Sequence, residues 1–168
     1  VFVDVGAAIG QITLMAADFC DNIIAFEPTL DSYFRENMAL NNKNIKLFPC
    51  ALSDHNGEEV INLNENDGIS SFESHYKSNS CGTRLITIRK FDDLNIKADF
   101  VKIRVQEHEY AVLKGMIKSL KDIKYVYCRL SPSNYRQINK FLAEHSFYPE
   151  EETKVLGSVF YKKQIVRS

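Results

Sequence analysis

Five apolar, strand-like runs alternate with segments of helical periodicity, and this alternation limits the possible folds more than any other feature of the sequence. The strand-like runs lie at residues 1–5, 22–26, 45–51, 98–105 and 124–130, and the helical segments lie at about 11–20, 31–40, 113–120 and 135–142. Parallel neighbouring strands need crossover helices, and such crossovers are right-handed. The alternation therefore predicts an α/β fold with a doubly wound, mostly parallel, Rossmann-like sheet.

Two segments depart from this alternation. Residues 53–94 contain short alternating runs, such as EEVINLNE and RLITIRKF, and predict a β-rich excursion after the third strand. Near the C-terminal end, YPEEE and SVFYKK flank Gly157 and predict an antiparallel hairpin. A chain of 168 residues that is 45% hydrophobic suits one domain over 1–168. Because Val1 already lies inside a strand-like run, we expect upstream residues to be missing.

Composition excludes several classes of function. The net charge of −1, with both signs interspersed, gives no electrostatic case for nucleic acid or a membrane surface as partner. No apolar run approaches a membrane span, and nothing resembles a signal peptide. The four cysteines, Cys20, Cys50, Cys81 and Cys128, are too widely spaced for a zinc site or a tight disulfide framework. We expect a cytoplasmic protein without a metal site, and the oligomeric state is not predicted.

The strongest functional signal is the turn after the first strand together with the acid that ends the second. The turn reads Asp4-Val-Gly6-Ala-Ala-Ile-Gly10, and Glu27 follows at the tip of the next strand. Glycine lets the backbone adopt unusual dihedral angles and lets a ligand approach closely. A carboxylate about 20 residues further on is placed to accept hydrogen bonds from ribose hydroxyls. This combination predicts an adenosine-containing ligand.

The glycine spacing indicates which ligand. A dinucleotide pyrophosphate needs G-x-G-x-x-G, but Ala8 and Gln11 occupy the second and third glycine positions, which argues against a nicotinamide-dependent dehydrogenase. The pattern D-x-G-x-x-x-G suits S-adenosylmethionine, whose amino group could be held by turn carbonyls near the charge of Asp4. The alternative is that Gly6 and Gly10 only permit tight packing and that Glu27 is a solvated acid.

Five segments, in order, make the chain resemble the FkbM-type S-adenosylmethionine-dependent methyltransferases over essentially its whole length. They are VFVDVGAAIGQITL, IIAFEPTLDSYFRENMALN, CALSDHNGE, ITIRKFDDL and VKIRVQEHEYAVLKGM. The resemblance implies a class I methyltransferase fold that binds S-adenosylmethionine and methylates a hydroxyl of a sugar or another small molecule. It also implies cofactor contacts for Asp4, Gly6, Ala7 and Gly10 on the methionine side, Glu27 at the ribose, and Ala51, Ser53 and Asp54 near the adenine.

The chain departs from the family at the predicted acceptor pocket. Arg104 stands where the family has aspartate, Gln106 where it has glutamate, Glu107 where it has glycine and Arg129 where it has glutamate. Ala8 also replaces the usual asparagine. The family's carboxylates could act as a base, position the acceptor or help to bind a metal. An arginine can do none of these, because it is always protonated and only donates hydrogen bonds.

Three interpretations of the departures remain open. Arg104 and Arg129 could form a fork for an acidic acceptor. Alternatively, cofactor binding persists while catalysis is weak or absent, which needs no coordinated new geometry. In the third, Arg104 pairs with Glu107 or Glu109 as an ordinary ion pair. The catalytic residue is unassigned, with His108 and Glu109 as candidates, and the aromatic residues Phe72 and Tyr76 could cover an acceptor.

Overall fold

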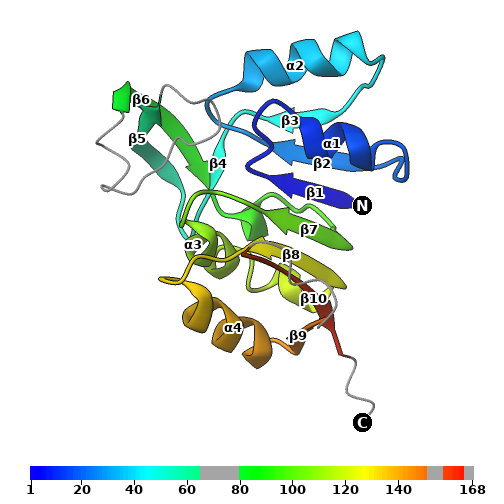
Figure 1. The fold of residues 1–168 in the computed structure, drawn as a ribbon, viewed down its shortest axis with the longest axis vertical. Coiled ribbons are helices and arrows are strands. Elements are labelled where there is room, and N and C mark those ends of the chain that lie inside the picture. Colours follow the sequence, from blue (N-terminus) through cyan, green and yellow to red (C-terminus); the bar gives the residue numbers. More distant parts are fainter. Residues whose placement is uncertain (65–79, 151–156, 165–168) are drawn as a thin grey trace.

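The computed structural model describes residues 1–64, 80–150 and 157–164, and its main element is a seven-stranded sheet of order β3-β2-β1-β7-β8-β10-β9 (Figure 1). The strands are β1 (Phe2–Val5), β2 (Ile23–Phe26), β3 (Lys46–Phe48), β7 (Phe100–Ile103), β8 (Tyr125–Arg129), β9 (Phe147–Pro149) and β10 (Ser158–Lys163). Every pair from β3 to β8 is parallel, whereas β10 is antiparallel to both of its neighbours. The predicted mostly parallel sheet with a C-terminal antiparallel hairpin is confirmed, although residues 151 and 152 of that prediction lie outside the described residues.

Helices cover both faces of the sheet, as the doubly wound prediction requires. They are α1 (Gln11–Ala16), α2 (Asp31–Leu40), α3 (Glu109–Lys114) and α4 (Tyr135–Glu144). Successive strand residues point to opposite faces, so Ala25 packs with the α2 residues Phe34 and Met38, while Phe26 joins the larger cluster that contains Val112 of α3. Among the described residues, no helix has the length and apolar character needed to cross a membrane.

Two predicted helices differ from the observed ones at their C-terminal ends. The first helix ends at Ala16, and Lys43 donates to the carbonyl of Ala17 just beyond it, at 3.2 Å. The helix after β7 ends at Lys114, and Gly115, which follows it, packs so closely on the backbone of Ser53 that a Cβ there would lie 1.9 Å from its carbonyl oxygen. The helical spacing stops there, so Ile117 of the predicted buried stripe is 46% exposed, whereas Met116 is fully buried.

The third predicted strand is divided between two sheets. Its second part, β4 (Ala51–Leu52), leaves the main sheet and pairs with β6 (Ser80–Arg89), which in turn pairs antiparallel with β5 (Gly57–Asn64). This three-stranded accessory sheet confirms the β-rich excursion for its described part. It lies beyond the carboxyl ends of the parallel strands (Figure 1).

An arginine on the accessory sheet contacts the loop that follows β2. Nη1 of Arg84 donates to the carbonyl of Thr29 at 2.9 Å, and Nη2 lies 3.9 Å from a carboxylate oxygen of Asp31. This contact holds β6 over the same sheet edge at which β1 and β2 end. The accessory sheet therefore forms one wall of any binding site at that edge.

Candidate functional site

A cavity of about 610 Å³ opens at the carboxyl edge of the main sheet, beside β1. The chain proceeds outward from β1 to β2 and β3 and then returns to β7 on the other side, so the cavity lies at the point where the strand order reverses. Ligands of open α/β sheets bind at such points. Its described walls include Val5, Gly6, Ala8, Phe26–Leu30, Cys50–Leu52, Ile61, Arg104–Gln106 and His108.

The two glycines of the first turn are both required by packing. Gly6 has a φ of 74°, and a Cβ there would lie 2.2 Å from the carbonyl oxygen of Arg104. Gly10 has a φ of 90°, and a Cβ there would lie 2.5 Å from Cε of Met38. Gly6 also lines the cavity, whereas Gly10 and the buried Ala7 do not. Packing therefore accounts for Gly10, and Gly6 serves both packing and the cavity wall.

Glu27 is a cavity residue, and the alternative of a solvated surface acid is wrong because only 6% of it is exposed. Its Oε1 accepts hydrogen bonds from the amide and hydroxyl of Thr29, each at 2.8 Å, and from the amide of Leu30 at 3.1 Å. Oε2 accepts one, from the amide of Ala8 at 2.9 Å. A carboxylate offers about four acceptor positions, so Oε2 keeps capacity for a ligand hydroxyl.

The prediction that Asp4 offers charge to a cofactor needs correction. Asp4 is fully buried and does not line the cavity. Nζ of Lys102 lies 2.7 Å from its Oδ1, and the hydroxyl of Thr13 donates to its Oδ2 at 2.7 Å. The same ammonium also donates to the carbonyl of Gly6 at 2.8 Å. The charge of Asp4 is therefore satisfied inside the protein.

Lys102 is the main site residue that the sequence reasoning missed. It interrupts the apolar run FVKIRV, and a buried lysine needs a partner. The register places it directly opposite Asp4 on β1. The available signal was a cation between apolar neighbours in one predicted core strand and a lone acid in another.

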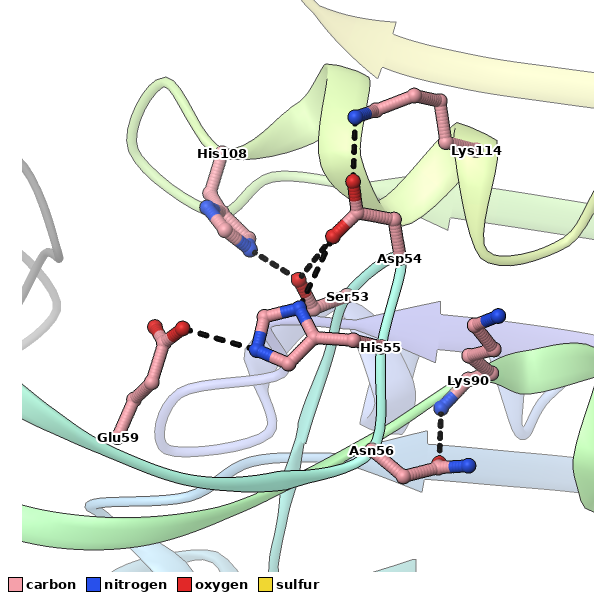
Figure 2. Close-up of polar contacts among 8 residues, drawn as sticks. All are labelled: Ser53, Asp54, His55, Asn56, Glu59, Lys90, His108 and Lys114. Carbon is pink, nitrogen blue, oxygen red and sulfur yellow. Dashed lines mark hydrogen bonds and ion pairs between the residues drawn. The ribbon is translucent and has the colours of Figure 1, made fainter.

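Of the three residues expected near the adenine, only Ala51 lines the cavity. The hydroxyl of Ser53 lies 3.0 Å from Nε2 of His108, which does line it, and 3.3 Å from Oδ1 of Asp54. Asp54 points away and forms an ion pair with Lys114 of α3 (Figure 2). Ser53 and Asp54 thus do not line the cavity, and Ser53 contacts the lining residue His108.

Asp54 also belongs to a chain of charges that runs to the accessory sheet (Figure 2). His55 lies between two carboxylates, with Nδ1 at 3.0 Å from Asp54 and Nε2 at 2.9 Å from Glu59 on β5. Hydrogen bonds from His55 and then Lys114 hold the pKa of Asp54 well below its usual range. The hydrogen bond to Asp54 is also the main cause of a raised pKa for His55.

The residues predicted for the acceptor pocket are divided between two adjoining cavities. Arg104 lines the first cavity, and Arg129 and Glu107 line a second one of about 500 Å³. Gln106 lines both. The two guanidinium groups therefore do not form the predicted fork within one cavity.

The alternative in which Arg104 pairs with Glu109 is not supported, because both carboxylate oxygens of Glu109 have other partners. Glu109 is 1% exposed and accepts hydrogen bonds from the amide of Val105 and from Nδ2 of Asn134, each at 3.0 Å. Burial raises the pKa of Glu109. Both of its oxygens have protein partners, so its main role is to link the turn after β7 to the residue that precedes α4.

Two further expectations concern metals and aromatic cover. No group of three or more His, Cys, Asp or Glu side chains is arranged to hold a metal ion in the described part of the chain. Phe72 and Tyr76 lie outside the described residues.

Strand order, helices on both faces and a cavity at the strand reversal together define an α/β protein of the class I methyltransferase fold. The chain belongs to the methyltransferase FkbM domain family, whose model matches residues 4–149. No curated protein matches the chain in sequence.

Three solved structures illustrate the shared fold. Methyltransferase FkbM from Methylobacillus flagellatus has a TM-score of 0.64 at 15% identity, over 95% of this chain and 42% of that one. A methyltransferase from Pyrococcus furiosus has a TM-score of 0.55 at 14% identity, over 98% and 75%. Magnesium protoporphyrin IX methyltransferase from Synechocystis, with bound SAM, has a TM-score of 0.56 at 9% identity, over 97% and 69%. The chain thus spans less than half the length of the first of these.

Proposed function

We propose that the chain is an S-adenosylmethionine-dependent methyltransferase domain that methylates a hydroxyl of a sugar or another small molecule. The observation that carries this proposal is the buried carboxylate of Glu27 at the tip of β2, in the wall of a cavity at the strand reversal. Family membership and the SAM-bound structure from Synechocystis support it. The acceptor class follows the family resemblance.

The cavity residues fit the adenosine part of this cofactor. Phe26, Leu52 and Ile61 provide apolar walls for a base, and the open position on Oε2 of Glu27 suits a ribose hydroxyl. When bound, the cofactor would supply a sulfonium methyl group for transfer to an acceptor oxygen. His108 is the one imidazole in the described walls, and we assign it the uptake of the hydroxyl proton.

Calorimetric titration with S-adenosylhomocysteine tests the cofactor half of the proposal. The wild-type protein should bind, and Glu27→Ala should bind at least about tenfold more weakly, because a charge-assisted hydrogen bond is lost. Glu36→Ala removes an exposed acid from α2 and should bind like the wild type. A folded wild-type sample that shows no binding would refute the proposal.

A second candidate is a cofactor-binding protein of methyltransferase ancestry with little or no catalysis. The observation that favours it is the presence of Arg104 and Gln106 in the cavity wall, where the family resemblance expects acids. Methyl transfer to a panel of sugars should be compared in the wild type and in the triple variant R104D, Q106E and R129E. Activity that appears only in the triple variant supports this candidate, and robust wild-type activity excludes it.

A further inference from the structure

We propose that Arg104 binds the carboxylate of the cofactor's amino-acid part and so makes the site selective for ligands that carry this group. The inference rests on the proposed function, in which the cavity holds S-adenosylmethionine. Arg104 follows directly after β7 and lines the cavity together with Gly6 and Ala8. Its guanidinium forms no hydrogen bond or ion pair in the parts of the chain that the structure describes. Such a group matches a carboxylate through two parallel N–H donors.

Two groups near the first turn that could instead attract the cofactor's amino group, Asp4 and the carbonyl of Gly6, are already engaged by Lys102. Nζ of Lys102 lies 2.7 Å from Oδ1 of Asp4 and 2.8 Å from the carbonyl oxygen of Gly6. An ammonium brought to this part of the cavity wall would therefore find Asp4 already neutralised by Lys102 and would meet the guanidinium of Arg104, a charge of its own sign. Opposite charges attract and like charges repel. The cavity wall at Arg104 therefore favours the carboxylate of the ligand over its ammonium group.

The position of Glu27 fixes the direction in which the ligand lies. Glu27 follows β2, Arg104 follows β7, and β1 runs between these two strands. A ligand whose ribose contacts Glu27 must cross the end of β1 before its amino-acid part reaches Arg104. The turn at Gly6 lies on that path and offers no Cβ to block it.

Titration with a matched pair of ligands tests the inference. S-adenosylhomocysteine and its decarboxylated analogue, S-adenosyl-3-thiopropylamine, share the adenosine, the thioether and the amine, and differ only in the carboxylate. The wild type should prefer S-adenosylhomocysteine by at least about tenfold, a factor that corresponds to about 1.4 kcal/mol. Arg104→Gln should weaken that ligand by about the same factor and leave the analogue unchanged. Arg129→Gln, the same charge change at the neighbouring cavity, should keep the wild-type preference.

The outcomes separate the two proposals. Equal affinity of the wild type for both ligands, or an unchanged preference in Arg104→Gln, overturns the role of Arg104 while leaving cofactor binding in place. No binding of either ligand or of 5′-methylthioadenosine by a folded sample overturns the proposed function and this inference together. The comparison of ligands on the wild type does not depend on the folding of any variant, and far-UV circular dichroism verifies the variants.

Discussion

Two consecutive residues at the edge of both cavities hold a left-handed backbone. Gln106 has a φ of 54° and Glu107 a φ of 75°, a region that L residues rarely adopt. The amide of Val105 donates to Oε1 of Glu109 at 3.0 Å, and this bond closes the turn. Backbone strain of this kind persists where contacts with the surrounding structure hold the residue in the strained conformation. Here it places Gln106 in the walls of both cavities.

Replacement of Glu107 by glycine should stabilise the protein by up to about 1.5 kcal/mol. The left-handed conformation costs an L residue about 1–2 kcal/mol, and glycine loses about 0.5–1 kcal/mol of this gain through its greater freedom in the unfolded chain. Glu107→Ala is the matched control, because it removes the carboxylate and keeps the Cβ. Urea denaturation should give a higher midpoint for the glycine variant than for the alanine variant. Equal midpoints would contradict the strain argument.

At the scale of elements, a buried ion pair joins β1 to β7. Asp4 and Lys102 are neighbours in the strand register, and both are almost entirely buried. The ammonium also reaches the carbonyl of Gly6, so the pair fixes the start of the first turn relative to β7. The cost of removing two charges from water is offset only by good ion-pair geometry and additional hydrogen bonds. The hydroxyl of Thr13 provides one such bond to Asp4.

Lys102→Met should lower the free energy of unfolding by about 3–5 kcal/mol, because it leaves the buried carboxylate of Asp4 without its counter-charge. Adding Asp4→Asn should recover part of the loss, and the double-mutant cycle should give a coupling above about 0.5 kcal/mol. Lys124→Met, which removes an exposed partner of Asp99, should change stability far less. Urea denaturation of the four proteins of the cycle and of Lys124→Met measures these differences. A Lys102→Met midpoint close to that of the wild type would disprove the importance of the pair.

The elements were predictable from sequence to the extent that local pattern decides them. The core strands are apolar runs flanked by turn residues, and this pattern is local. The transfer of Ala51–Leu52 to the accessory sheet depends on pairing with Ile88 and Arg89, which lie far along the chain. The contact of Lys102 with Asp4 likewise requires the strand order. The place of Glu27 in the site was predictable because it lies at a strand end. Its hydrogen bonds to Thr29 and Leu30 in the following loop were not predictable from sequence.

At the scale of the whole molecule, charged side chains tie the accessory sheet to the main body. Lys114 of α3 pairs with Asp54, Asp54 with His55, and His55 with Glu59 of β5 (Figure 2). Within the accessory sheet itself, the amide of Lys90, just after β6, donates to the side chain of Asn56, just before β5, at 2.8 Å. The contacts that run from α3 to β5 keep the accessory sheet beside the cavity, one of whose walls it forms.

The contribution of His55 to stability should decrease as the pH rises. Its pKa is raised above the ordinary value of 6.5 by hydrogen bonding to Asp54, so folding favours the charged imidazole. The stabilisation is fully present below pH 6.5 and is lost as the pH rises through the raised folded-state pKa. Urea denaturation should therefore show a larger difference between the wild type and His55→Gln at pH 6 than at pH 9.

The effect should stay below about 1 kcal/mol, because the side chain is 48% exposed and solvent screens the pair. Glu59→Gln removes one of the two carboxylates and should reduce the pH dependence without abolishing it. A difference that is independent of pH, or that grows toward pH 9, would exclude a charged histidine in this position.

The pairing of β10 has a consequence for the order in which the fold can be completed. This strand is among the last described residues of the chain, yet it lies inside the sheet between β8 and β9, and Tyr161 within it is fully buried. During synthesis, β8 and β9 therefore leave the ribosome before the strand that joins them. A nascent chain that ends before Ser158 lacks β10 and cannot join β9 to β8. Protease resistance of β9 and α4 should therefore appear only after β10 has emerged from the ribosome. Resistance in shorter nascent chains would show that these elements dock without it.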